Sequence, residues 1–405
     1  MSMIKREAYM AKIRPFINKD LVKVLTGIRR SGKSTLLQLV QQELLADGVS
    51  ESQICSINFE SLARANSDMM ATYQELLDFG KGHSGKTYIF LDEIQELPGW
   101  EKMINSLRVD MDCDLYVTGS NSKLLSGELA TYLAGRYIEI SVYPFSFSEI
   151  MSAESQKHPD RSVEELFQHF LRFGGMPFIY ENDLNPSATL TYLRDIYHSI
   201  LLKDIIARYS IRDTELYDRV TSYLLANVGN SFSGVSVMKY LKNENRAMSQ
   251  ETLYNYIAYA QDACLLHLAP RVDVQGKKML KFQEKIFLAD QGIREAVYGN
   301  NDRDVNQILE NIVFLELLRR GYKVSIGKTD AKEIDFVAEK ASQRIYIQVS
   351  YLLADDSVIQ REFSAFADIR DNYPKFVLSL DHYDFSREGI VHKNLIDFLL
   401  DTSDG

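Results

Sequence analysis

The sequence predicts an α/β protein in which a parallel sheet covered by helices is followed by helical segments and a second α/β region. Three observations support this fold class. Apolar runs at residues 21–26 and 88–91 have the length and composition of buried strands, and helical patterns separate them. A glycine-rich turn stands directly between the first run and the helix that follows it. Short strand patterns return after residue 320.

The glycine-rich turn at residues 27–34 reads Gly-Ile-Arg-Arg-Ser-Gly-Lys-Ser and matches the pattern G-x-x-x-x-G-K-[ST]. In this pattern, backbone N–H groups at a helix N-terminus surround phosphate groups. We expect Lys33 to reach the β- and γ-phosphates and Ser34 to hold Mg²⁺. The nucleotide-binding residues expected from this turn are Gly27, Arg29, Arg30, Ser31, Gly32, Lys33, Ser34 and Thr35.

The apolar run at residues 88–91 ends in two carboxylates, Asp92 and Glu93, which is the form of a Walker B segment. Asp92 is expected to hold Mg²⁺, and Glu93 is expected to orient and deprotonate the attacking water. Another strand pattern, at residues 53–59, lies between the two motifs. An inserted strand and an acid after Asp92 favour ATPases that carry their own catalytic glutamate. No convincing guanine-specificity motif is present, so ATP is the expected nucleotide.

These motifs resemble those of the AAA+-type ATPases of bacteria and archaea that carry a C-terminal winged-helix and nuclease-like region of unassigned function. The resemblance covers most of the chain. Its markers are residues 26–34, 90–95 and 118–122 and, more weakly, residues 174–177 and 348–351. It implies a P-loop NTPase core with a helical lid, and ATP and Mg²⁺ as cofactors.

The resemblance also implies roles for three residues outside the two motifs. Asn121, or alternatively Ser120, follows a strand pattern where a polar residue senses the γ-phosphate, although both are common turn residues. Arg136 precedes the last core strand, where ring-forming ATPases place a catalytic arginine finger; a surface salt bridge is the alternative. Pro177 ends a Gly-Gly-Met-Pro turn that either lies near adenine or is an ordinary turn.

Composition limits the remaining possibilities. The 405 residues, 45% of them hydrophobic and 25% charged, suit a globular protein of two or three domains. The sequence shows neither a membrane-spanning run nor a signal peptide. Its three cysteines are scattered and predict neither disulfides nor a zinc site, so we expect a cytoplasmic protein. A net charge of −10 argues against DNA binding driven by global charge, but it leaves a local basic patch open.

We predict four domains: an ATPase core at residues 1–150, a helical lid at 151–214, a winged-helix-like domain at 215–300 and a restriction-endonuclease-like domain at 301–405. The third helix of the winged-helix pattern, at residues 249–265, carries neither Lys nor Arg. The hairpin after it is basic, so it would supply phosphate contacts to DNA, whereas packing on the ATPase is the alternative. Its basic residues are Arg271, Lys277, Lys278, Lys281 and Lys285.

The last domain resembles the restriction-endonuclease-like fold, with strand patterns at residues 322–326, 334–338 and 345–350. Active members place carboxylates on the second and third strands and a Lys two residues after the second acid. Here Asp335 fits and Glu310 supplies a helix acid, but Gln348 and Ser350 replace the second carboxylate and the Lys. Losing a metal ligand and a cation together predicts a domain without nuclease activity.

The sequence therefore predicts an ATPase that couples its nucleotide state to its C-terminal domains. One hypothesis is an enzyme that acts on DNA as a homo-oligomeric ring, with its basic hairpin on the phosphates. The alternative is a nucleotide-gated switch that binds a protein partner and has no nucleic-acid activity. DNA-stimulated turnover and salt-dependent DNA binding distinguish the two hypotheses. Neither involves a membrane.

Overall fold

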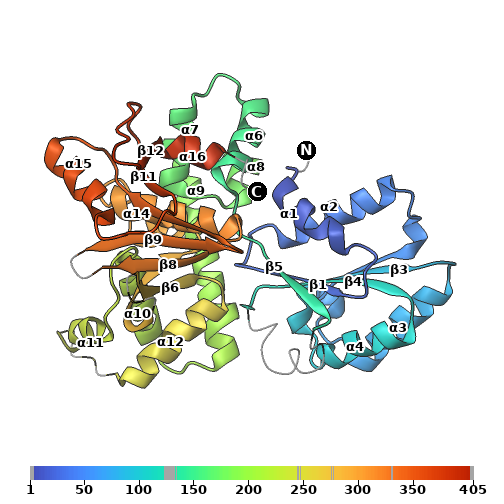
Figure 1. The fold of residues 1–405 in the computed structure, drawn as a ribbon. Helices are drawn as coiled ribbons and strands as arrows, with labels where there is room; N and C mark the ends of the chain where they lie inside the picture. The colour runs from blue at the N-terminus through green and yellow to red at the C-terminus, as the bar shows by residue number, and fades with distance from the viewer. Residues whose placement is uncertain are drawn as a thin grey trace. The chain divides into compact units, whose positions relative to one another are not determined.

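The computed structural model describes residues 4–122, 133, 135–243, 246, 248–274, 276, 278–329 and 332–401, with the side chains of residues 278–283 left out. The chain divides into two compact units (Figure 1). The first unit is Met1–Tyr143 with Asp262–Cys264, and the second is Pro144–Gln261 with Leu265–Gly405.

The first unit is built on a five-stranded parallel sheet with the order β2-β3-β4-β1-β5. Its strands are β1 (Val22–Thr26), β2 (Ile54–Asn58), β3 (Thr87–Asp92), β4 (Cys113–Gly119) and β5 (Tyr137–Ser141). The predicted parallel sheet is confirmed. Because β4 lies between β1 and β3, the carboxyl ends of these three strands meet at one edge of the sheet (Figure 1).

Helices cover both faces of this sheet, because alternate strand residues point to opposite sides. Val24 and Val117 pack in a core with Trp100, whereas Leu25 and Tyr116 pack in a second core. The helices around these cores are α1 (Glu7–Ile13), α2 (Lys33–Ala46), α3 (Met69–Lys81) and α4 (Trp100–Asp110). Both faces of β1 and β3 are therefore buried, which explains their uninterrupted apolar runs.

The second unit begins with helices where the sequence predicts a helical lid. They are α6 (Phe147–Lys157), α7 (Val163–Phe173), α8 (Pro177–Glu181), α9 (Pro186–Ser199) and a π-helix (Ile200–Ala207). Ser146 and Ser162 begin α6 and α7 with capping boxes, in which the side chain of a glutamate three residues later returns the hydrogen bond. Leu193, Ile196 and Ile205 are buried along α9 and the π-helix, as their helical spacing predicts.

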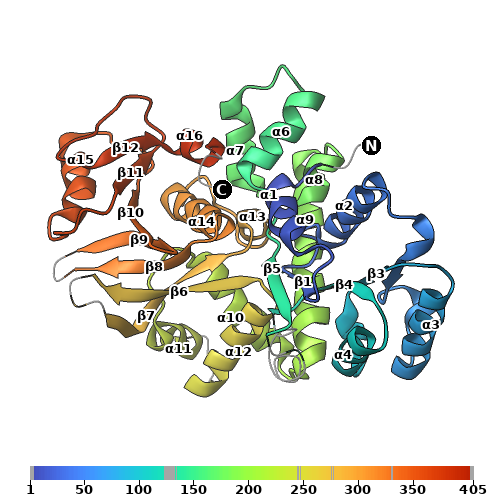
Figure 2. The same cartoon turned by 45° about the vertical axis from the view of Figure 1, so that its right-hand side comes forward.

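A seven-stranded mixed sheet with the order β12-β11-β10-β9-β8-β6-β7 forms the rest of the second unit. Its strands are β6 (Leu266–Asp273), β7 (Lys278–Leu288), β8 (Lys323–Lys328), β9 (Glu333–Lys340), β10 (Gln343–Val349), β11 (Lys375–Ser379) and β12 (Val391–Asn394). The hairpin β6–β7 belongs to this sheet because β6 pairs in parallel with β8 (Figure 2). The sheet thus crosses the boundary that the sequence places after residue 300.

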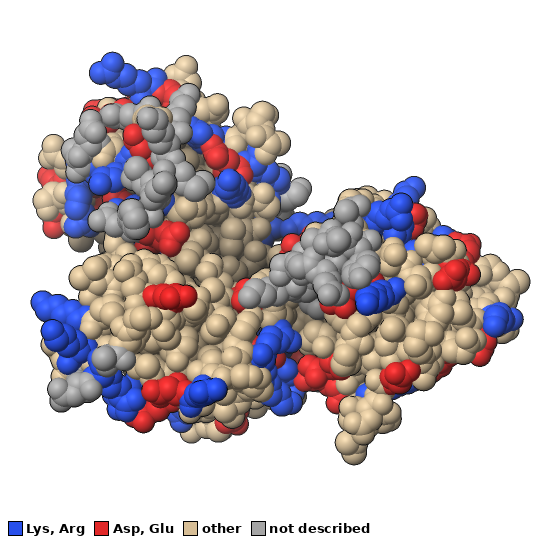
Figure 3. Space-filling model, turned by 90° about the horizontal axis from the view of Figure 1, so that it is seen from below, with Lys and Arg blue, Asp and Glu red and all other residues tan. Residues whose placement is uncertain are grey.

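Helices pack around this sheet, and three of them precede the hairpin at the positions that the winged-helix pattern indicates. They are α10 (Thr214–Ala226), α11 (Gly234–Asn243), α12 (Gln250–Asp262), α13 (Gln291–Val297), α14 (Val305–Arg319), α15 (Asp356–Phe363) and α16 (Leu395–Leu400). Within the described ranges, every helix is too short or too polar to cross a membrane. On the face drawn in Figure 3, basic and acidic side chains are interspersed among other residues.

Candidate functional site

The glycine-rich turn joins the end of β1 to the start of α2 and leaves the helix N-terminus open. Gly27 has φ of 145°, and Gly32, which precedes the first residue of α2, has φ of 94°. Both values lie in the region that only glycine adopts easily. A Cβ atom on Gly27 would lie 2.1 Å from the carbonyl oxygen of Val142. The turn therefore packs backbone against backbone and directs the free N–H groups of α2 outward for an anion.

Lys33 is buried in this turn, and its ammonium is held by groups of the site itself. Nζ donates to the carbonyl oxygens of Gly27 at 2.9 Å and Ile28 at 3.2 Å. It also lies 3.3 Å from Oγ of Ser120 and 3.8 Å from Oε1 of Glu93. A lysine on two carbonyls can move to a stronger anion, since carbonyl oxygens carry only partial charge.

Asp92 ends β3 beneath the turn and is fixed by side chains from two neighbouring strands. Oγ1 of Thr118, on β4, donates to Oδ1 of Asp92 at 2.5 Å. Nδ2 of Asn58, on β2, donates to Oδ2 at 3.0 Å. Burial raises the pKa of Asp92, although hydrogen bonds from Thr118 and Ser34 act in the opposite direction. The contact between Asp92 and Ser34 brings together the two residues that the sequence predicts as Mg²⁺ ligands.

Glu93 follows in a left-handed backbone conformation, with φ of 50° and ψ of 50°. This conformation is uncommon for a residue with a side chain, and it turns the carboxylate toward β4. Oγ of Ser120 lies 2.8 Å from both carboxylate oxygens, and Nε2 of Gln95 donates to Oε2 at 2.6 Å. Burial alone would raise the pKa of Glu93, but Lys33 and these hydrogen bonds outweigh it, so the pKa is lowered.

The other residues predicted from the turn are placed around this cluster. Ser31 is buried, and its Oγ has no hydrogen-bond partner in the part of the chain that the structure describes. Arg29 is buried and donates to Oε1 of Glu60 at 2.7 Å. Arg30 is exposed with φ of 67°, and Thr35 is half-buried on the first turn of α2.

Asn121 and Arg136 are the predicted sensor and arginine finger, and both lie in the first unit. Asn121 is buried and follows Ser120 at the end of β4. Ser120, the alternative sensor position, contacts both Lys33 and Glu93. Arg136 is exposed immediately before β5. Their roles as sensor and arginine finger stay predictions.

Pro177 begins α8 in the second unit, so its predicted contact with adenine would join the two units and stays a prediction. The glycines that precede Pro177 contact Asp290, which lies in the same unit. Gly174 has φ of 74°, and a Cβ there would lie 2.0 Å from Oδ1 of Asp290. The N–H of Gly175 donates to Oδ2 of the same carboxylate at 2.7 Å. Burial raises the pKa of Asp290 to about 6.

Sequence reasoning missed three polar residues that hold the carboxylates: Asn58, Gln95 and Thr118. The sequence places each of them near the site, because Asn58 and Thr118 lie near the ends of predicted strands and Gln95 lies two residues after Glu93. To predict their contacts with the carboxylates, one must also know which strands are neighbours in the sheet. Only the position of β4 between β1 and β3 shows that Thr118 reaches Asp92.

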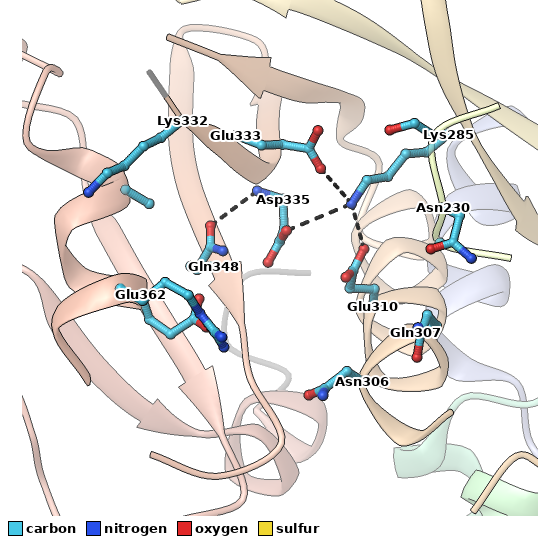
Figure 4. Close-up of a pocket in the computed structure, with 14 residues that line it drawn as sticks. Asn230, Lys285, Asn306, Gln307, Glu310, Lys332, Glu333, Asp335, Gln348 and Glu362 are labelled. Atoms are coloured by element: carbon cyan, nitrogen blue, oxygen red, sulfur yellow. Dashed lines mark hydrogen bonds and ion pairs between the residues drawn. The ribbon is translucent and has the colours of Figure 1, made fainter. Parts of the chain in front are cut away.

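The nuclease-like residues of the second unit also meet, at a pocket lined by α14, β9 and β10 (Figure 4). Glu310, Asp335 and Gln348 line it, as the predicted site requires. Ser350 does not line it, and its Oγ lies 3.3 Å from the carbonyl oxygen of Leu352. Lys285, which belongs to the basic hairpin and is predicted to contact DNA phosphates, is buried among these carboxylates.

The structure gives Arg271 protein partners, and its predicted contact with DNA stays a prediction. Its side chain is buried, and its guanidinium pairs with Ser231 and Glu333 rather than facing solvent. Lys277 lies outside the described residues, as do the side chains of Lys278 and Lys281. Their predicted contacts with DNA stay predictions.

Two known domain families match parts of this chain. Residues 19–151 match the AAA domain, and residues 164–304 match a domain of unknown function, DUF8612. An uncharacterized protein of Haemophilus influenzae is 37% identical over 98% of this chain and 99% of its own length. An uncharacterized protein of Methanocaldococcus jannaschii is 29% identical over 88% of this chain and 82% of its own length. The predicted AAA-type P-loop ATPase domain is thereby confirmed.

A solved structure, that of a Walker-type ATPase of Pyrococcus abyssi, is similar in fold. It aligns with a TM-score of 0.52 over 73% of this chain and 96% of that chain, with 16% sequence identity. At this identity the similarity concerns the fold alone.

We expect Gly27→Ala to destabilise the first unit and to weaken nucleotide binding. Gly48→Ala is the matched control, because Gly48 has φ of 92° but no atom within 4 Å of its missing Cβ. Backbone strain alone should cost each variant about 1–2 kcal/mol of unfolding free energy. The clash with Val142 should cost Gly27→Ala about 1–3 kcal/mol more. Urea denaturation and titration with a fluorescent nucleotide measure both effects, and equal behaviour of the two variants would contradict the packing argument.

Proposed function

Because this chain belongs to the same family as the Haemophilus influenzae protein and carries an AAA domain, we propose that it hydrolyses ATP in a Mg²⁺-dependent reaction. One observation carries the proposal. Lys33 and Glu93 are brought within 3.8 Å of each other, beside an Asp92 that contacts Ser34. A phosphate-binding cation, a metal-binding carboxylate and a general base thus belong to one buried cluster.

The residues present fit Mg-ATP. The N-terminus of α2 and the Oγ of Ser31, which has no hydrogen-bond partner within the described ranges, are suited to phosphate oxygens. Ser34 and Asp92 would hold Mg²⁺, which neutralises charge on the phosphates when bound. The raised pKa of Asp92 reflects a carboxylate that burial has deprived of solvation and that a cation would stabilise.

Glu93 is suited to act as the general base. Its lowered pKa keeps it ionised near neutral pH, and Ser120 and Gln95 fix its orientation. In this structure, the Lys33 ammonium lies close enough to Glu93 to weaken the basicity of the Glu93 carboxylate. Transfer of the Lys33 ammonium from the carbonyls of Gly27 and Ile28 to the phosphates would remove part of this restraint. Glu93 would then gain basicity when nucleotide is in place.

Glu93→Gln should retain ATP binding and lose at least about 100-fold in turnover, because the attacking water loses its base. Lys33→Ala should instead weaken binding itself, since the phosphates lose a direct cation contact. Glu96→Gln is the matched control: Glu96 is an exposed glutamate on the same turn and should leave both quantities unchanged. Steady-state ATPase rates and nucleotide titrations distinguish these results. Turnover at the parental rate in Glu93→Gln would exclude Glu93 as the base.

We propose further that Arg136 completes the site of a neighbouring copy of the chain. Its exposure before β5 leaves the guanidinium accessible to a second molecule. Arg136→Ala should then be nearly inactive, and mixing it with inactive Glu93→Gln should restore some turnover at mixed interfaces. Full activity of Arg136→Ala, in a protein that stays monomeric with every nucleotide by light scattering, would refute a role in trans.

We propose that ATP turnover is coupled to the C-terminal region. The two hypotheses differ in the partner of that region, which is DNA in the first and a protein in the second. Action on DNA requires exposed cations, but Arg271 and Lys285 of the basic hairpin are buried among carboxylates. This observation favours the nucleotide-gated switch with a protein partner. The ATPase rate should then change less than about twofold on addition of single-stranded, duplex or branched DNA at low salt. Strong stimulation that declines steeply with salt would instead establish action on DNA.

A further inference from the structure

The pocket of the second unit has a volume of about 460 Å³ and is lined by charged and amide side chains (Figure 4). Four of its lining residues carry carboxylates: Glu310 on α14, Glu333 and Asp335 on β9, and Glu362 on α15. Asp335 is buried and Glu310 is half-buried, and their side chains face the same space. So much negative charge in a buried space requires a cation, protons or both.

Lys285 supplies a cation at the point where the carboxylates converge. Its Nζ lies 2.8 Å from Oε1 of Glu333, 2.9 Å from Oε2 of Glu310 and 3.8 Å from Oδ1 of Asp335 (Figure 4). The side chain of Lys285 is 6% exposed. Burial alone would lower the pKa of Lys285, but the three carboxylates outweigh it and raise the pKa.

The distribution of charge shows which carboxylates depend on Lys285. Glu333 also pairs with Arg271, and Glu362 pairs with Arg361 at 2.6 Å. Glu310 and Asp335 have no other cation within ion-pair distance in the described part of the chain. Burial, followed by the charge of Glu310, raises the pKa of Asp335. Lys285 is thus the common counter-ion of the two carboxylates that the nuclease-like pattern assigns to a metal.

Both carboxylate oxygens of Asp335 and the amide oxygen of Gln348 already have partners. Oδ2 of Asp335 accepts from the N–H of Val349 at 2.8 Å, and Oδ1 faces Lys285. Oε1 of Gln348 lies 3.3 Å from the N–H of Asp335. Mg²⁺ demands near-octahedral oxygen coordination and gives up its water reluctantly. A divalent ion would therefore have to displace a buried ammonium that holds three carboxylates.

We propose that the Lys285 ammonium is the resident cation of this pocket, that it takes the place of a divalent ion between Glu310 and Asp335, and that it keeps the pocket free of metal. The ammonium also ties β7 to α14 and β9. The second unit then works as a metal-independent module, and removing the ammonium should uncover a divalent-cation site made by Glu310, Asp335 and Gln348.

The test measures Mn²⁺ binding to the full-length chain without nucleotide, by electron paramagnetic resonance and by thermal melting. We expect Lys285→Met to bind one more Mn²⁺ per chain than the parent and to melt at a lower temperature, part of which Mn²⁺ restores. Adding Asp335→Asn to this variant should abolish the extra ion. Lys332→Met is the matched control, because Lys332 lines the same pocket but donates to Ser364 rather than to the carboxylates. It should bind no extra ion.

Two results would overturn the proposal. The first is a Mn²⁺ ion bound to the parent chain and lost in Asp335→Asn, which shows that the ammonium does not exclude metal. This measurement uses folded parent protein and stays decisive if Lys285→Met does not fold. The second is a folded Lys285→Met that binds no extra Mn²⁺, whatever its melting temperature. Because the ATPase site is common to all these proteins, their turnover reports separately on the first unit.

Discussion

The position of β4 between β1 and β3 is the constraint on which the first unit's site depends. In a parallel sheet, this order places the end of β4 between the strand that carries the phosphate-binding turn and the strand that ends in two acids. Thr118 and Ser120 can therefore hold Asp92 and Glu93 from one side while Lys33 approaches from the other. Hydrogen bonds and ion pairs in this space are strong because the surrounding strands exclude water.

The sequence was sufficient for the parts of this site that lie close together along the chain. Lys33, Ser34, Asp92 and Glu93 belong to two short motifs whose spacing reflects one turn and one strand end. Ser120, assigned from the sequence only as an alternative sensor, owes its contacts with both Lys33 and Glu93 to strand order. Hydrophobic periodicity identifies strands, but it does not determine which strands become neighbours.

The same limit explains the larger difference in the second unit. A basic hairpin after three helices has one sequence pattern whether it projects into solvent or continues a sheet. Here β6 pairs with β8, so Arg271 and Lys285 become buried counter-ions for carboxylates on β9 and α14. The carboxylates were visible in the sequence, but the cation that neutralises them comes from a segment 50 residues before Asp335. The sequence also predicts no strand at β12, because its four residues are too few to show an alternating pattern.

Because β6 lies inside the seven-stranded sheet, we expect the hairpin and the last hundred residues to fold and unfold together. Separating them would expose unpaired backbone along both β6 and β8, leaving edges prone to aggregation. Amide protons of β6, β8 and β9 should accordingly exchange with solvent through a shared opening rather than as separate domains. Gene fusions or truncations that treat residue 300 as a domain border would cut through a cooperative unit, whereas a cleaved chain could remain associated through its completed sheet.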